Sequence, residues 1–255
     1  MAKASAVQPE WIESTLFTQH HIRGLFTLRY GGISPPPFDS QNFGMGLGDP
    51  DANINENLRT FVQASALPCT PHQAIQTHQT STLWCNGSGS SHPNEADILL
   101  SDQPDTPLAV RTADCLPILL ADPITGITAA AHAGWRGTAS SVATQAIEAM
   151  CERGADKEGI LASLGPCIGP CCFQIGEEAA TALKNSTPSA SKFIDNCADL
   201  RQINRLQLLE CGLTDTNIEL INACTACDNK HFFSFRRDAG QTGRHIAVVA
   251  IASKP

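Results

Sequence analysis

The sequence predicts an α/β protein of the α+β type, in which a mixed β-sheet or a pair of sheets carries helices on its outside. Apolar strand-like runs outnumber the segments with helical periodicity, and the two kinds do not alternate strictly. Strict alternation would instead favour a regular doubly wound fold. Hydrophobic residues make up 42% of the chain and charged residues 16%, which supports a packed core and argues against disorder.

The predicted strands are short apolar runs. In chain order they span residues 21–29, 96–101, 108–121, 127–133, 160–165, 218–224, 231–236 and 245–252. No low-complexity linker separates them. A chain of 255 residues can form one large domain or two small ones.

Helical periodicity marks three segments between these strands. They span residues 54–67, 138–154 and 200–212. Pro68 closes the first, and Gly212 closes the third. The second has Thr138 and Ser140 as candidate N-caps and Gly154 as its stop.

The charge and the cysteines restrict the class of protein. A net charge of −8 disfavours nucleic-acid binding, because phosphate backbones attract basic surfaces, although a few local donors can still bind a small anion. Glu10 and Glu13 stand where a secretory signal needs an unbroken apolar core, and no apolar run is long enough to cross a bilayer. The eleven cysteines, an odd number, do not fit a secreted disulfide scaffold. We expect a reduced, cytoplasmic protein that binds neither nucleic acid nor membranes.

Residues 110–137 contain the strongest functional signal. Cys115 and His132 lie at the ends of two apolar runs, and His78 stands upstream in IQTHQT. Two imidazoles and a thiolate are ligands that zinc or copper prefers, and three ligands would leave one position open. Each residue alone is more often structural, and their spacing fits no compact metal motif. Asp114, beside Cys115, needs a partner within its apolar surroundings.

A second signal is the glycine-rich turn that follows His132. Gly134 and Gly137 permit a sharp turn, and a helix starting near Thr138 would direct free N–H groups toward it. With Arg136 as a charged clamp, this turn predicts an anion site. The alternative is a plain turn with a solvated arginine. The later segment FFSFRRDAGQTGR contains Arg236, Arg237 and Arg244 and is either a surface turn or a second anion-binding element.

The remaining cysteines form two groups. Cys224 and Cys227 make a C-x-x-C pair, and GPCIGPCC contains Cys167, Cys171 and Cys172. The pair is compatible with half of a zinc knuckle or with a redox pair. Because no second C-x-x-C of suitable spacing completes it, we interpret these residues as structural thiols.

Seven motifs together resemble bacterial members of the laccase-domain family, over about residues 25–249. They are TLRYGGISPPPFDSQNFG, IQTHQT, ADILLS, TADCLPILL, AAHAGWRG, LGPCIGPCCFQIG and FFSFRRDAGQTGR. Members of this family have been described as multicopper polyphenol oxidases, as peptidoglycan editing factors and as purine nucleoside phosphorylases. Any one motif alone would be weak, but their order and number make the resemblance specific.

The resemblance implies a single domain, residues 1–255, with four α/β/β/α layers and mixed β-sheets. It implies a metal, usually zinc, on His78, Cys115 and His132; we expect one zinc per chain, with copper as the other candidate. It also implies catalytic positions for Arg29, Asn42 and Arg136 near that metal. For the substrate or its phosphate we predict contacts from Gly134, Gly137 and Arg237.

The leading functional hypothesis from this resemblance is a purine nucleoside enzyme. It would phosphorolyse adenosine, inosine and methylthioadenosine, and a metal-activated water would deaminate adenosine. The alternative is an amidase that edits peptidoglycan precursors, using either the metal or Cys115 as nucleophile and His132 as base. Copper-dependent phenol oxidation ranks third, because it needs several copper centres and the sequence offers one ligand trio. The expected partners are a nucleoside and phosphate, and the oligomeric state stays open.

Overall fold

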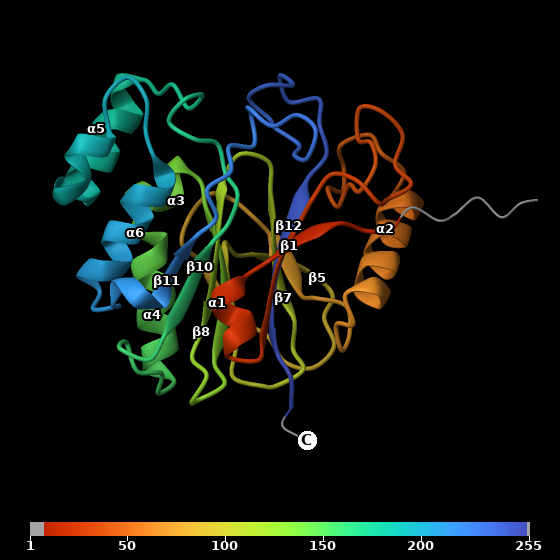
Figure 1. Ribbon diagram of the computed structural model, residues 1–255, viewed down its shortest axis with the longest axis horizontal. Coiled ribbons are helices and arrows are strands. Elements are labelled where there is room, and N and C mark those ends of the chain that lie inside the picture. The colour runs from red at the N-terminus through yellow and green to blue at the C-terminus, as the bar shows by residue number, and fades with distance from the viewer. Residues whose placement is uncertain (1–7, 254–255) are drawn as a thin grey trace, which may run out of the picture.

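Two β-sheets lie face to face in the computed structural model, which describes residues 8–253, with several helices outside one sheet and one long helix outside the other (Figure 1). The four-stranded sheet has the order β1-β2-β12-β7, and every neighbouring pair is antiparallel. Its strands are β1 (Trp11–Glu13), β2 (Ile22–Thr27), β12 (His245–Ile251) and β7 (Leu108–Thr112).

Side chains of this sheet alternate between two apolar layers. Leu25, Ile246 and Val248 pack against Phe61 of helix α2 (Asp51–Ala64), which covers the outer face. Phe26 and Val249 face the opposite way, into the layer between the sheets. This period of two buries both faces of the sheet.

The six-stranded sheet is mixed and has the order β11-β10-β8-β9-β6-β4. Its outer pairs β10–β11 and β4–β6 are parallel, and the three pairs between them are antiparallel. Its strands are β11 (Ile218–Leu220), β10 (Leu161–Leu164), β8 (Leu116–Ala121), β9 (Thr128–Ala133), β6 (Ile98–Ser101) and β4 (Thr82–Trp84). A separate parallel pair joins β3 (Gln73–Ile75) and β5 (Ser91–Glu95).

Most helices cover the outer face of the six-stranded sheet, on the left of Figure 1. They are α3 (Trp135–Ala139), α4 (Val142–Glu152), α5 (Glu177–Ser186), the 3₁₀ helix η1 (Pro188–Phe193) and α6 (Leu200–Glu210). The short α1 (Thr15–Gln19) packs beside β2, and a second 3₁₀ helix, η2 (Asp215–Asn217), precedes β11. The resulting helix–sheet–sheet–helix order confirms the expected four layers. Across residues 8–253, no helix combines the length and the apolar character that a membrane span requires.

Several predicted elements differ from the structure. Residues 231–236 form a loop and not a strand, because Ser234 Oγ and the Arg236 N–H donate to Asp114 in place of a sheet neighbour. The run 108–121 is two strands separated by a turn that contains Asp114, whose φ is +88°. The run 218–224 is a strand only as far as Leu220.

The predicted helix 138–154 is also wrong at its start. The chain enters α3 at Trp135, after Gly134, and breaks before α4 at Ser141, which has a left-handed φ of +58°. Thr138 is therefore not an N-cap: it is buried inside α3, and its Oγ1 accepts a hydrogen bond from Asn204. Gly154 and Gly212 do end their helices, with φ of +97° and +106°.

Candidate active site at the strand ends

His78, Cys115 and His132 meet, although 54 residues separate the first from the last. In the β8–β9 pair Pro117 lies opposite His132 and Leu116 opposite Ala133, so Cys115, just before β8, falls beside His132. His78 follows β3 in a left-handed backbone conformation, with a φ of +62°. The ligand atoms of the three side chains all lie within 4.8 Å of one another.

Asp97, a fully buried residue just before β6, orients both histidines. Its Oδ1 lies 2.7 Å from His132 Nδ1, which leaves Nε2 of that ring for the site. Its carboxylate also accepts hydrogen bonds from three consecutive backbone N–H groups, those of Thr77 at 2.9 Å, His78 at 3.0 Å and Gln79 at 3.0 Å. Burial would raise the pKa of Asp97, but His132 and these donors hold it below its usual value.

Cys115 and His132 shift each other's pKa in opposite directions. Burial disfavours both charges, yet the positive His132 and hydrogen bonds from both histidines lower the pKa of Cys115 to about 6. Against the same burial, Cys115 and Asp97 raise the pKa of His132 to about 9. A thiolate is the form of cysteine that both binds metals and attacks carbon.

The residues fit the metal that the sequence implies. Two imidazoles and one thiolate match zinc or copper, and three protein ligands leave a coordination position for water or substrate. Gly134 also allows the ligands to approach, since a Cβ there would lie 2.9 Å from His78 Cδ2 and 3.1 Å from Cys115 Sγ. A Cβ at Gly137 would lie 3.4 Å from the Gln79 carbonyl oxygen, which is an ordinary contact distance.

The trio borders a cavity of about 730 Å³. The guanidinium-bearing residues along its wall are Arg111, Arg136, Arg236 and Arg244. Within residues 8–253 none of the four forms an ion pair with a carboxylate. Burial and the nearby Arg244 lower the pKa of Arg111. A cavity with uncompensated cations is suited to an anionic ligand.

The same cavity exposes apolar side chains. Met45, Ile75 and Phe235 line it with exposed fractions of 42%, 48% and 53%, although large hydrophobic residues are normally covered. Trp135 is also part of the wall and stacks under Arg136, whose Cζ lies 4.3 Å from the ring centre. Cations and exposed apolar surface therefore share one cavity.

Five of the predicted site residues are not among those that line this cavity, namely Arg29, Asn42, Gly134, Gly137 and Arg237. Arg29 forms an ion pair with Asp39 at 3.2 Å, and Arg237 donates to Asp238 and to backbone carbonyls. Asn42 is buried, and its Oδ1 accepts the Arg244 N–H at 2.8 Å. Asn42 thus supports a residue that does reach the cavity. Direct contact of these five residues with substrate remains a prediction.

Sequence reasoning missed Asp97 and Arg111 as site residues, whereas Arg244 belongs to the segment that it marked as a possible second anion-binding element. Asp97 had a usable signal, because it is a carboxylate next to the apolar run ILLS and needs partners when buried. The same argument, applied to Asp114, is confirmed: Thr225 Oγ1 donates to Asp114 Oδ1 at 2.6 Å. Arg111 carries a charge within an apolar predicted strand, which was a further sign of a site residue.

The structure assembles two further groups of possible metal ligands that the sequence did not bring together. His72, Cys85 and His92 form one group, in which His72 Nδ1 and His92 Nε2 are hydrogen bonded at 2.7 Å and the rings are stacked. Burial raises the pKa of the Cys85 thiol to about 11. The second group consists of Cys171, Cys172, Cys224 and Cys227.

Comparisons with known proteins agree with this architecture. The human protein named purine nucleoside phosphorylase LACC1 is 35% identical over 251 residues, which cover 94% of this chain and 58% of the human protein. The chain thus spans just over half the length of the human and mouse LACC1 proteins. The Escherichia coli protein named purine nucleoside phosphorylase YfiH is 36% identical over 224 residues, 87% of this chain and 90% of that protein.

A solved structure extends the similarity to three dimensions. The crystal structure of YlmD from Geobacillus stearothermophilus matches with a TM-score of 0.87 and 28% identity, covering 98% of this chain and 100% of that one. The model of one family, described as multi-copper polyphenol oxidoreductase laccase, matches residues 23–252. The protein therefore belongs to the multi-copper polyphenol oxidoreductase laccase family.

Proposed function

We propose that the protein is a metal-dependent purine nucleoside phosphorylase that also deaminates adenosine. One observation carries the proposal: the His78–Cys115–His132 trio borders the same cavity as four arginines that have no carboxylate partner among residues 8–253. The names of the human and Escherichia coli relatives support it. The proposed substrates are adenosine, inosine and methylthioadenosine.

The arginines would bind inorganic phosphate. Guanidinium groups form paired, charge-assisted hydrogen bonds to phosphate oxygens. Arg136 and Arg244 lie in separate segments of the wall, so both can reach one anion from different sides. Burial lowers the pKa of Arg244, and the charge of Cys115 opposes this shift because Arg244 lies near the trio.

In phosphorolysis a phosphate oxygen bonds to ribose C1′ while the bond from C1′ to the purine nitrogen breaks. The electron pair leaves with the base, which takes up a proton, and the sugar becomes ribose 1-phosphate. The chain's contribution is to hold phosphate and nucleoside in line. Phe235 and Trp135 offer aromatic faces for the purine.

His78, Cys115 and His132 would hold the metal, for which we propose one zinc. When bound, the metal supplies a water with a pKa near neutrality, which is the chemistry that deamination of adenosine requires. Asp97 keeps the His132 Nδ1 occupied and so fixes the ring. The open side of the trio would face the cavity, because the exposed His78 and the half-buried Cys115 both line it.

The test is to incubate the purified chain with adenosine, with and without phosphate, and to separate the products. Phosphate-dependent release of adenine is expected, together with phosphate-independent formation of inosine. Metal analysis should find zinc at the trio. Absence of both products, or several coppers per chain together with phenol oxidation, would overturn the proposal.

An amidase acting on peptidoglycan precursors is the second candidate, and one observation favours it. Asp97, His132 and Cys115 are ordered as acid, base and nucleophile, with 2.7 Å between Asp97 Oδ1 and His132 Nδ1. Such an enzyme would cleave a serine-containing muropeptide precursor after removal of the metal by a chelator. Retention of nucleoside turnover only in the metal-loaded protein would exclude this candidate as the main activity.

A further inference from the structure

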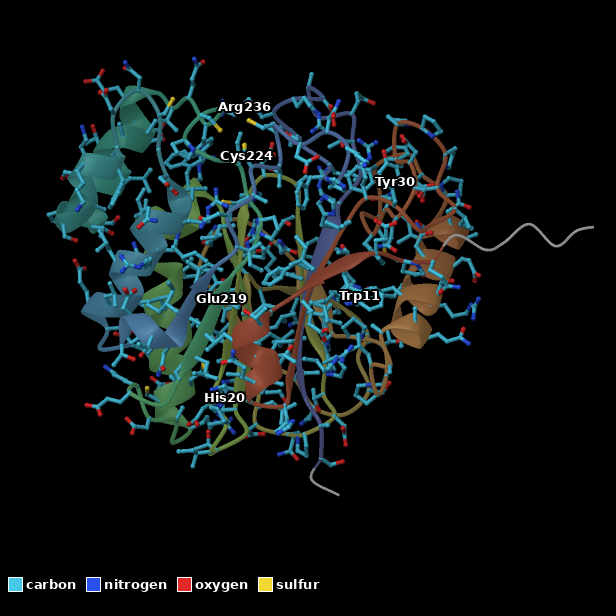
Figure 2. All side chains as sticks on the ribbon, viewed as in Figure 1. Trp11, His20, Tyr30, Glu219, Cys224 and Arg236 are labelled. Atoms are coloured by element: carbon cyan, nitrogen blue, oxygen red, sulfur yellow. The ribbon has the colours of Figure 1, made fainter. Side chains whose placement is uncertain are left out.

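A cluster of four cysteines lies outside the proposed catalytic site. Cys171 and Cys172 belong to the turn after β10, and Cys224 and Cys227 belong to the turn after β11. All four Sγ atoms lie within 4.8 Å of one another. Cys227 Sγ is 3.5 Å from Cys171 Sγ and 3.3 Å from Cys172 Sγ. Figure 2 shows Cys224 and Arg236 together on the loops above the sheets.

We propose that these four cysteines bind one zinc ion, at a second metal site that is separate from the His78–Cys115–His132 trio. Tetrahedral zinc with Zn–S bonds of about 2.3 Å places its sulfur atoms about 3.8 Å apart. The observed spacing brackets that value, so small side-chain rotations complete the tetrahedron. All four positions are filled by protein sulfur, which is typical of a structural site.

The backbone around the cluster is built for close approach of the two turns. An isolated β-bridge pairs Cys167 with Cys224, and the Thr225 N–H donates to the Cys167 carbonyl at 3.1 Å. The Gly169 N–H donates to Cys224 Sγ at 3.2 Å. A Cβ on Gly169 would lie 3.3 Å from both Cys171 Sγ and Cys224 Cβ. These contacts hold the sulfur atoms together before any ion binds.

The surrounding charge also suits a zinc tetrathiolate, whose net charge is −2. Arg201 is buried, and its Nη1 donates to the carbonyls of Ile221 and Ala223 at 2.8 Å each, directly before Cys224. A Cβ on Gly169 would lie 3.5 Å from Arg201 Nη2. A buried cation therefore lies beneath the cluster and favours a negative site there.

Hydrogen bonds to Asp114, the neighbour of Cys115, connect the turns that carry the four cysteines to the wall of the cavity. Thr225, between two of the cysteines, donates to Asp114 Oδ1, and the Arg236 N–H donates to Asp114 Oδ2 at 2.6 Å. The Arg236 side chain in turn donates to the carbonyls of Cys172 and Gln174. The second metal would thus fix the wall of the cavity without touching substrate.

The test uses the Cys115→Ser variant of the full chain, which retains the four cysteines but lacks the thiolate of the trio. Purified under reducing conditions and titrated with zinc alone, it should bind one zinc per chain, whereas the unaltered chain binds two. X-ray absorption at the zinc edge of this variant should report four sulfur neighbours at about 2.3 Å. Adding Cys224→Ser should remove the remaining ion, and Cys69→Ser, at a half-buried cysteine elsewhere, should not.

Two results would overturn the proposal. One is a Cys115→Ser chain that binds no zinc while all four thiols react freely. The other is a digest of the unaltered chain in which peptide masses show a disulfide between two of Cys171, Cys172, Cys224 and Cys227. Neither readout depends on nucleoside turnover, so failure of this site and failure of the proposed activity are distinguishable. The absorption measurement also stays decisive if the Cys224 variant does not fold.

Discussion

The trio and the cysteine cluster gather sulfur ligands in two different ways. The trio lies at strand ends, and the fully buried carboxylate of Asp97, just before β6, fixes it through four hydrogen bonds. The cluster lies on two turns, with two of its four cysteines exposed. The trio combines nitrogen and sulfur ligands and borders a cavity, whereas all four ligands of the cluster are sulfur atoms. A ligand set that is incomplete and rigid is suited to chemistry, and one that is complete and local is suited to holding loops together.

The two regions also depend differently on a metal. At the trio, Asp97 and the β8–β9 register keep the ligands in place without an ion. At the cluster, the turns are held mainly by backbone contacts and by one N–H···S hydrogen bond. We therefore expect metal removal to abolish activity at the first region and to loosen loops at the second.

Loss of the trio's thiolate should have the largest effect. Cys115→Ser removes the only sulfur ligand of that site, so we expect nucleoside turnover at the level of the buffer blank. The cysteine cluster should retain its zinc. Product analysis and metal content measured on the same sample check this. Retained turnover would contradict the metal mechanism, and Cys69→Ser serves as the matched control.

Replacement of the buried Asp97 should weaken metal binding at the trio and leave metal binding at the cysteine cluster unchanged. Asp97→Asn keeps the size of the side chain but loses the charge that orients His132. Loss of such a partner typically lowers metal affinity about 10–100-fold. Competition with a chelator should show this decrease at the trio and no change at the cluster. Asp102→Asn, at an acidic residue paired with Arg153 instead, should change neither affinity.

The arginines around the cavity should separate phosphate binding from metal binding. Arg136→Ala should raise the KM for phosphate about 10-fold, the usual loss for one charged hydrogen bond, and leave both metals bound. Arg153 is a close control, because it stacks over Trp84 at 4.4 Å as Arg136 does over Trp135 at 4.3 Å. Arg153→Ala should not change the KM. An unchanged phosphate dependence in Arg136→Ala would contradict its clamp role.

The sequence predicted the parts of this molecule whose physics is local. Apolar runs located most strands, and Gly154 and Gly212 marked two helix ends through the left-handed backbone they adopt. The metal trio followed from the ligand types of His78, Cys115 and His132 together with the family motifs. Their meeting depends on strand register, which no short window of sequence reports.

The features that the sequence predicted wrongly or missed share a cause, which is long-range pairing of polar groups. Residues 231–236 alternate like a strand, but Asp114, far away in sequence, draws Ser234 and the Arg236 N–H into a loop. The cysteine cluster was missed because its halves, 171–172 and 224–227, are individually too small to count as a metal motif. Only the parallel arrangement of β10 and β11 brings their following turns together.

The smallest effect that we expect is a change in how the free energy of unfolding depends on pH. It involves the loop that connects the two regions. This loop runs through residues 232–244 and is anchored where the Phe233 N–H donates to His245 Nε2 at 2.8 Å. Burial, assisted by the charge of Arg29, lowers the pKa of His245 to about 3. The folded chain therefore keeps this ring neutral where an unfolded histidine, with a pKa of about 6.5, is already protonated.

The sign of the pH effect follows from that difference. The unfolded state binds the extra proton below pH 6.5, so this histidine's contribution to stability is present above that pH and is lost as the pH falls toward 3. In His245→Gln, whose amide oxygen can still accept the Phe233 N–H, the free energy of unfolding should fall less steeply over this range. The difference in slope should approach one proton, at most about 1.4 kcal/mol per pH unit. Urea unfolding at several pH values measures it, with His20→Gln at an exposed histidine as the control. Equal slopes in the His245 variant and the unaltered chain would mean that the anchor of the loop titrates like a solvated side chain, and that the two regions are not held together through a neutral ring.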